Sequence, residues 1–271
     1  MQLKDKLMLI TGASSGIGAA TAREAARRGV RVILVARSSD KLEQLAVDIR
    51  KEGGQAYVYP ADVTDPKAVQ ELASQVAAEL GTPDIVFNNA GIGRWQFIEE
   101  TSMEDGARMM AAPYNAAFYV TRAFLPGMLA RNSGTVANIT SLGGYMTWPG
   151  ASGYHAARWA MRGFTEGLRA DLHGTRVRTL MATFAKVNTE YWENNPGSES
   201  GLPRAQKMIP VLSAEATAKA ILFALRWDLR FISAPLMAYI ILFLNYLFPG
   251  ITRALLFSTG RRRSIGSTKT S

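Results

Sequence analysis

Three side chains near the middle of the sequence have types and a spacing suited to proton transfer. Tyr154 lies four residues before Arg158 in "SGYHAARWAMRGF" (152–164), and Ser141 ends the segment "NITS" thirteen residues upstream of the tyrosine. A free tyrosine has a pKa near 10, so its hydroxyl needs a nearby cation to exchange a proton at neutral pH. Ser141, Tyr154 and Arg158 are candidate catalytic residues only as a set within a suitable framework, because either hydroxyl taken alone is more often structural.

The motif "TGASSGIG" (11–18) is typical of a phosphate-binding turn. It follows a short apolar run and opens a segment with helical spacing. Gly12 permits a tight turn, Gly16 lets the backbone approach a pyrophosphate, and Gly18 allows close helix packing. The N-terminus of the following helix then faces the negative charge of the ligand, so the motif indicates a dinucleotide site.

The residue after the second apolar run bears on the choice of cofactor. A carboxylate at this point would bind both adenosine ribose hydroxyls of NAD and repel a 2′-phosphate. This chain instead has Ala36 and then Arg37, whose guanidinium suits a phosphate. We therefore expect NADP(H) rather than NAD(H).

These residues need a framework, and the sequence supplies alternating strand-like and helix-like segments. The strand-like segments are 6–11, 30–36, 56–62, 84–91, 134–141 and 177–183. The helical segments between them are 16–29, 39–52, 66–80, 102–131 and 152–173. Continuous apolar strands separated by helices predict an α/β fold: a doubly wound, mostly parallel sheet in a Rossmann-like αβα arrangement of three layers.

Across roughly residues 5–230 the sequence resembles the short-chain dehydrogenase/reductase family. The resemblance rests on "TGASSGIG", Asp62 in "ADV", "NNAG" (88–91), and the separation of Ser141 from Tyr154. It implies that the tyrosine passes a proton to or from a substrate oxygen held by the serine, while hydride moves on the nicotinamide. It also implies that Asp62 contacts the adenine, that Thr189 contacts the nicotinamide amide, and that Asn88, Ala90 and Gly91 shape the pocket. The expected cofactor-binding residues are Gly12, Ser14, Ser15, Gly16, Ile17, Gly18, Arg37, Asp62, Val63, Asn89, Ala90, Gly91, Tyr154, Arg158 and Thr189.

The sequence departs from the family pattern at three points on the nicotinamide side. Arg158 stands where the family has a lysine that supplies the cation, binds ribose and joins a proton relay; an arginine stays protonated and is a poor relay member. Pro113 occupies the position of the family's asparagine. Asn115 lies two residues further along the helix, so its side chain is turned about 200° from that position, and it could take the asparagine's place only if a helix bend realigns it. Phe184 and Ala185 replace a usual Pro-Gly pair.

These departures leave three interpretations open. The first is a working reductase with an altered proton path. The second is a catalytically impaired protein that binds NADP(H) and serves as a sensor or partner subunit. The third is non-redox chemistry, since a Ser–Tyr–Arg triad resembles that of the epoxide-forming halohydrin dehalogenases. Those enzymes lack the glycine-rich motif, which this chain keeps.

Aromatic and methionine residues are frequent in the loops and strand ends where the family builds its substrate pocket. They are Trp95, Tyr145, Met146, Trp148, Met181, Tyr191 and Trp192, and the Gly/Pro/Ser-rich segment 193–206 is suited to cover the substrate. Their number favours a hydrophobic or lipid-like carbonyl or alcohol substrate over a sugar or a small acid.

The segment "FISAPLMAYIILFLNYLFPGITRALLF" (231–257) is unusually apolar. The 22 residues from Phe231 to Thr252 carry no charge, a length that reaches across a bilayer, but prolines interrupt the run. We predict an edge strand, an apolar helix over 236–248 and a short helix ending near 258. An interfacial or monotopic membrane role, packing against a second subunit or the core, and a spanning helix all remain open.

Composition and charge limit the remaining possibilities. The 271 residues suit one domain (1–235) with an apolar extension (236–258) and a basic tail (259–271) that is expected to be disordered or to touch anionic lipid. More than half of the +9 net charge lies after residue 252, in Arg253, Arg261, Arg262, Arg263 and Lys269. No nucleic-acid motif accompanies the charge. With no cysteine and two histidines, neither disulfides nor a metal site are expected. No secretory signal is visible, so we expect a cytoplasmic protein that is peripheral or monotopic if it contacts a membrane. The family resemblance further implies a homodimer or a homotetramer.

Overall fold

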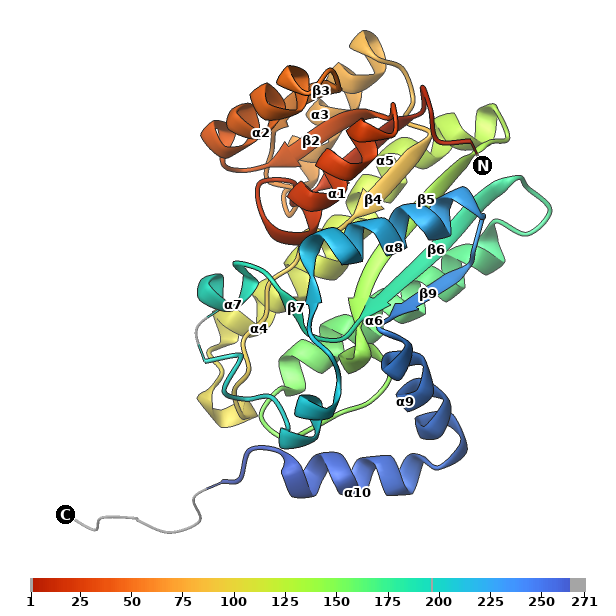
Figure 1. Cartoon of the computed structure of the whole chain (residues 1–271). Helices are drawn as coiled ribbons and strands as arrows, with labels where there is room; N and C mark the ends of the chain where they lie inside the picture. Colours follow the sequence, from red (N-terminus) through yellow and green to blue (C-terminus); the bar gives the residue numbers. More distant parts are fainter. Residues whose placement is uncertain (1, 196, 264–271) are drawn as a thin grey trace.

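Seven parallel strands form the central sheet of the molecule. Their order is β3-β2-β1-β4-β5-β6-β9, and every pairing in the described part of the sheet is parallel. The computed structural model describes residues 2–195 and 197–263. Figure 1 shows the sheet at the centre, with helices packed on both of its faces. The predicted doubly wound Rossmann-like fold is confirmed.

The strands are β1 Leu7–Thr11, β2 Arg31–Ala36, β3 Gln55–Pro60, β4 Ile85–Asn88, β5 Gly134–Ser141, β6 Val177–Phe184 and β9 Phe231–Ala234, with a separate two-stranded pair of β7 Val187–Asn188 and β8 Leu212–Ser213. The α-helices are α1 Gly16–Arg27, α2 Ser39–Lys51, α3 Pro66–Glu79, α4 Met103–Met110, α5 Ala116–Ala130, α6 Ser152–Asp171, α7 Tyr191–Asn194, α8 Ala214–Arg226, α9 Leu236–Leu247 and α10 Pro249–Thr259.

Two apolar layers hold the helices to the sheet. On one face, small and branched side chains of α1, α2 and α8 pack against β1, β2 and β6. On the other face, α3, α5 and α6 pack against the opposite side chains of the same strands. Strands β1 and β4 are almost completely buried because helices cover both faces, which explains their continuous apolar sequences.

Strand order reverses between β1 and β4, because the chain winds outward to β3 and then returns to the other side of β1. The loops after β1 and β4 therefore diverge at the carboxyl edge and leave a crevice there, which is where open α/β sheets bind ligands. This edge holds the glycine motif, the "NNAG" loop, Ser141 and the N-terminal end of α6.

The C-terminal segment folds as an edge strand and two helices, close to the predicted boundaries. Helices α9 and α10 meet at an angle of 118° and lie outside the sheet (Figure 1). The expectation of a disordered tail is wrong for its first residues, because Thr259 ends α10 and Arg261 and Arg263 form ion pairs with the domain. The remainder of the predicted tail, 264–271, lies outside the described residues.

Candidate active site

A cavity of about 610 Å³ opens at the carboxyl edge of the sheet. This volume lies within the range of roughly 300–1,000 Å³ that ligand and cofactor pockets occupy. Nearly all the predicted site residues line it: Gly12, Ser14, Ser15, Gly16, Ile17, Arg37, Asp62, Val63, Asn89, Ala90, Gly91, Ser141, Tyr154, Arg158 and Thr189. Segments far apart in the sequence thus meet around one space.

The glycine motif has the backbone that its residues predict. Gly12 and Gly16 adopt φ values of +64° and +53°, a region that favours glycine. A Cβ on Gly18 would lie 2.2 Å from the carbonyl oxygen of Gly12, so only glycine lets α1 start this close to β1. The loop is therefore a narrow cradle at a helix N-terminus, an arrangement that fits a pyrophosphate.

Hydrogen bonds connect the "NNAG" loop to the end of β1 and to the glycine cradle. The Asn89 side chain donates to the carbonyl oxygens of Thr11 and Gly12, at 2.9 and 3.2 Å. The Thr11 hydroxyl accepts from the backbone N–H groups of Asn89 and Ala90, both at 3.0 Å. Asn88 differs from the expectation, because it is not among the cavity-lining residues. Its amide donates instead to Thr121 and Asn138 in the buried interior.

The outer end of the cavity carries positive charge. Arg37 and Lys41 both line it, beside Asp62. Burial acts to raise the pKa of Asp62, but hydrogen bonds from the hydroxyl and N–H of Thr64, with the nearby charge of Arg37, bring it below its usual value. Asp62 is thus held ionised and fixed, while two cations remain close to the space that an adenosine phosphate would need. Lys41 escaped the sequence analysis because a lysine on a solvent-facing helix carries no motif.

Ser141 and Tyr154 meet at the inner end. The Tyr154 hydroxyl donates to Ser141 Oγ at 2.8 Å, and the backbone N–H of Gly143 donates to the same oxygen at 3.0 Å. Two acceptor positions of the serine hydroxyl are thereby used, so its own proton is free to point into the cavity. The pair offers a donor from serine and an exchangeable proton from tyrosine at one point.

Arg158 is buried beside this pair. Its guanidinium carbon lies 5.0 Å from the centre of the Tyr154 ring, and no carboxylate lies within 4 Å of it in the described ranges. Burial acts to lower the pKa of Arg158, but Tyr154 and Tyr191 raise it above its ordinary value, so the side chain stays protonated. A Cβ on Gly91 would lie 3.1 Å from Nη2 of Arg158, which explains why a glycine stands opposite it.

The proline in the long helical segment changes the helix geometry. Residues Ala111–Asn115 form a π-helical turn between α4 and α5, closed by the N–H of Ala116 donating to the carbonyl of Ala111. Pro113 has no N–H to donate, so the chain widens by one residue at this point. Ala111 and Ala112 line the cavity, whereas Pro113 and Asn115 do not. The bend therefore does not realign Asn115 into the site.

The end of β6 and the segment after it form one wall of the cavity. Phe184 is buried at the strand end, and it lines the cavity together with Ala185 and Lys186. A Cβ on Gly16 would lie 3.3 Å from Cβ of Thr189, so the threonine packs directly over the glycine cradle. Lys186 is a lining residue that the sequence analysis missed, because a single lysine after a strand has no distinguishing pattern.

Aromatic side chains build the apolar wall next to Tyr154. The ring centre of Trp95 lies 5.0 Å from that of Tyr154 and 5.2 Å from that of Trp148, with Trp192 at 6.0 Å. Tyr191 lines the same wall. Burial raises its pKa, Tyr154 adds to the rise, and the charge of Arg158 opposes it.

Three other residues suggested by the sequence lie outside the cavity lining. Met146 packs behind the aromatic wall, Met181 is buried within β6, and Tyr145 lies under the guanidinium of Arg162. The predicted covering segment does reach the site, since the Asn195 side chain accepts from the N–H of Gly93 at 2.8 Å.

Comparison with known proteins places this site in a family. The model of the short chain dehydrogenase family matches residues 6–199. An uncharacterized oxidoreductase of Mycobacterium bovis is 38% identical over 192 residues, which are 69% of this chain and 56% of that protein. The chain thus matches little more than half the length of that relative. A fatty acyl-CoA reductase of Acinetobacter baylyi is 32% identical over 82% of this chain and 74% of its own length.

Solved structures of short-chain dehydrogenases and related oxidoreductases resemble this chain in fold as well as in sequence. An alcohol dehydrogenase of Thermococcus sibiricus with 5-hydroxy-NADP is 28% identical, with a TM-score of 0.76 over 85% of this chain and 96% of that chain. A short-chain dehydrogenase of Sphingobium yanoikuyae with NADPH is 26% identical, with a TM-score of 0.78 over 97% of this chain and 99% of that chain. The chain belongs to the short-chain dehydrogenase family of oxidoreductases.

Proposed function

We propose that this protein is an NADP(H)-dependent oxidoreductase that reduces a carbonyl, or oxidises the corresponding alcohol, on a hydrophobic, lipid-like substrate. The observation that carries the proposal is the 2.8 Å hydrogen bond between Tyr154 and Ser141 at the inner end of a cavity whose outer end holds Arg37 and Lys41. The same cavity thus holds acid–base groups at one end and two cations suited to a phosphate at the other, with the glycine cradle between them.

The cradle residues would hold the dinucleotide. Ser14, Ser15 and Gly16 at the N-terminus of α1 would contact the pyrophosphate, and Arg37 with Lys41 would contact the adenosine phosphate. Thr189 and Arg158 would lie beside the nicotinamide ribose and amide. When bound, the nicotinamide supplies or accepts the hydride.

The protein's own side chains then handle the substrate oxygen. In the reductive direction the Ser141 hydroxyl donates a hydrogen bond to the carbonyl oxygen, and the Tyr154 hydroxyl turns from the serine to give that oxygen a proton. The phenolate left on Tyr154 is stabilised by the guanidinium of Arg158, which lies 5.0 Å from the ring centre. Arg158 supplies charge without releasing a proton, so the phenolate must be reprotonated from solvent by another path.

The aromatic wall favours an apolar substrate. Trp95, Trp148 and Trp192 line the cavity next to Tyr154, and apolar side chains of α9 and α10 pack behind them. A pocket wall of this kind stabilises a long alkyl group more than a polar one. The fatty acyl-CoA reductase among the relatives is consistent with this substrate class.

NADPH-dependent reduction of long-chain aldehydes tests the proposal. Tyr154→Phe removes one hydroxyl and keeps the ring against Trp95, and we expect it to lower kcat about 100- to 10,000-fold. The matched control is Tyr145→Phe, since Tyr145 lies nine residues away and outside the cavity lining. Equal activity of wild type and Tyr154→Phe would contradict the assigned role of Tyr154.

The second candidate is a protein that binds NADP(H) with little or no turnover. It is favoured by one observation: neither Pro113 nor Asn115 brings a side-chain amide to the cavity. Tight NADPH binding, together with absent reduction of aldehydes and ketones of every chain length, would support this candidate over the first.

A further inference from the structure

The C-terminal arm, residues 236–263, exposes apolar side chains on its outer surface. It comprises α9, α10 and the short segment after them. The large apolar residues that are at least one-third exposed are Leu236, Met237, Ile240, Phe243, Leu244, Tyr246, Leu247, Phe248, Ile251, Leu255 and Phe257. Exposed apolar residues gathered this densely on one element mark a binding surface.

The inner surface of the arm is also apolar. Ala238, Ile241, Leu242 and Leu256 pack against the cluster that contains Trp95 and Trp148. The inner surface of the arm is therefore packed against the domain, and no other part of the described residues 2–195 and 197–263 covers its outer surface.

Specific polar contacts hold the arm in this position. The Asn245 side chain donates to the carbonyl of Tyr145 at 3.2 Å and accepts from the Thr252 hydroxyl at 2.7 Å, which fixes the bend between the two helices. At the far end, Arg261 donates twice to Glu100, at 2.8 and 3.0 Å, and Arg263 donates to Glu99 at 3.1 Å.

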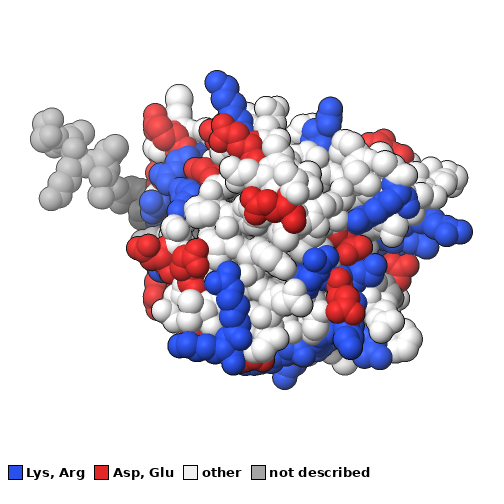
Figure 2. All heavy atoms as spheres, turned by 90° about the horizontal axis from the view of Figure 1, so that it is seen from above, with Lys and Arg blue, Asp and Glu red and all other residues white. Residues whose placement is uncertain are grey.

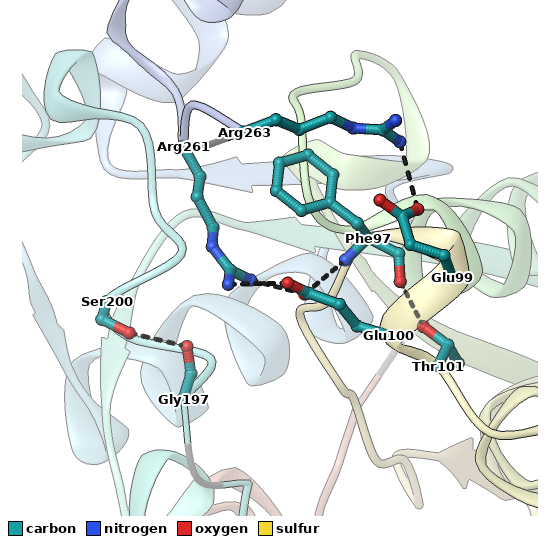
Figure 3. A network of polar contacts seen from close by, with 8 residues as sticks. All are labelled: Phe97, Glu99, Glu100, Thr101, Gly197, Ser200, Arg261 and Arg263. Carbon is teal, nitrogen blue, oxygen red and sulfur yellow. Dashed lines mark hydrogen bonds and ion pairs between the residues drawn. The ribbon is translucent and has the colours of Figure 1, made fainter. Parts of the chain in front are cut away.

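Figure 3 shows how this far end is clamped. Both guanidinium groups lie over the ring of Phe97, with Cζ of Arg261 at 5.0 Å and Cζ of Arg263 at 4.8 Å from its centre. The arm is thus tied to the domain at its bend and at its end, as well as through β9 at its start. Its apolar outer surface is preformed.

The contacts that hold the arm to the domain limit how the arm could associate with a membrane. No single helix in the described ranges passes as a membrane span; α9 and α10 do so only together, across their 118° bend. The end of α10 returns to the domain through Arg261, whereas a spanning segment would carry it to the opposite side of a bilayer. The geometry suits a surface that lies along a membrane.

The charge of the segment points to the kind of surface that it meets. Residues 231–271 contain no aspartate or glutamate. Arg253 and Arg262 are exposed beside the apolar residues. Tyr246 has the amphipathic ring that favours the bilayer interface, and Phe243 and Phe248 add apolar rings of the kind found on the buried face of interfacial helices. A second copy of the chain packed on the same surface would bring like charges together. In contrast, Figure 2 shows acidic and basic side chains interspersed at the end of the molecule away from α10.

We propose that the C-terminal arm docks the protein on an anionic lipid bilayer, with its apolar side chains in the interface and its arginines at the headgroups. Membrane docking through the arm does not require reductase activity. If the proposed activity also holds, docking places the aromatic wall of the cavity next to the membrane, from which a lipid-like substrate would enter.

Flotation of the full-length protein with vesicles tests the proposal without cofactor or substrate. We expect binding to phosphatidylcholine vesicles that contain phosphatidylserine, and weaker binding to phosphatidylcholine alone or at high salt. The triple variant Phe243→Ser, Ile251→Ser, Phe257→Ser should bind about 100-fold more weakly or worse. The double variant Arg253→Gln, Arg262→Gln should bind roughly 10- to 30-fold more weakly to the anionic vesicles.

The matched control is Phe223→Ser with Trp227→Ser. These two apolar residues are about as exposed as those of the triple variant but lie at α8. Their loss should leave vesicle binding unchanged. Wild-type protein that fails to float, or a triple variant that floats equally well, would overturn the proposal. So would a wild-type dimer without vesicle binding that the triple variant converts to monomer, because a second copy would then cover the surface.

Discussion

Replacing Arg158 by methionine tests how the site handles the charge left on Tyr154. Methionine fills similar space but carries no charge, and Arg158 has no carboxylate partner within 4 Å in the described ranges that the change would leave unpaired. At the 5.0 Å between the guanidinium carbon and the ring centre, two unit charges attract by about 3 kcal/mol at an effective dielectric constant of about 20. Losing this stabilisation should slow reduction roughly 100-fold, since 1.36 kcal/mol corresponds to about tenfold in rate.

Single-turnover oxidation of prebound NADPH by a long-chain aldehyde measures this step directly. Arg158→Lys keeps the positive charge and should retain most of the rate. Arg162→Met is the matched control, because Arg162 lies one turn further along α6 and stacks on Tyr145 at 4.3 Å, outside the cavity lining. If Arg158→Met binds NADPH, unfolds like wild type and reduces the aldehyde at a rate within about threefold of it, then Arg158 does not stabilise the phenolate.

Three further predictions concern the cofactor and stability. Gly18→Ala places a Cβ 2.2 Å from the Gly12 carbonyl, so it should weaken NADPH binding in titrations and lower the unfolding free energy by about 1–3 kcal/mol in urea, whereas Gly167→Ala, with open space around it, should do neither. Arg37→Ala should raise the Kd for NADPH about 10- to 100-fold and hardly change that for NADH, as measured by calorimetry. Burial lowers the pKa of His155, so the unfolded chain takes up a proton that the folded one resists. Wild type should therefore lose stability as the pH falls below about 6.5, by up to about 1.4 kcal/mol per unit, relative to His155→Gln in urea unfolding.

The order of the strands from β1 to β6, and of the helices between them, followed from the sequence because each of these strands is a short apolar run bounded by a turn or a helix start. Helix α8 and the β7–β8 pair were not predicted. The glycine cradle was equally readable. The positive φ at Gly12 and Gly16 and the close contact at Gly18 are demands of a local backbone that few other residues meet. Local constraints of this kind leave a signature in the residues themselves.

Features that depend on distant contacts were harder to predict. The sequence shows Pro113, but it did not predict that the chain forms a π-helical turn around this proline. That turn leaves Asn115 outside the cavity. The contacts of Arg261 and Arg263 with Glu100 and Glu99 join residues about 160 positions apart, and the basic tail alone gave no sign of them. Side-chain direction also separated Trp95, on the cavity wall, from other aromatic residues in similar loops.

Binding of NADPH and NADH, followed by quenching of tryptophan fluorescence, is the most direct test of whether this cavity is an NADP(H) site. Three of the five tryptophans, Trp95, Trp148 and Trp192, line the cavity, so a bound nicotinamide would lie close to them. If this cavity binds NADP(H), NADPH should quench the fluorescence saturably in the micromolar range, and NADH should bind markedly more weakly. If neither cofactor bound, the cavity would not be a nicotinamide dinucleotide site and the proposed reductase function would be wrong.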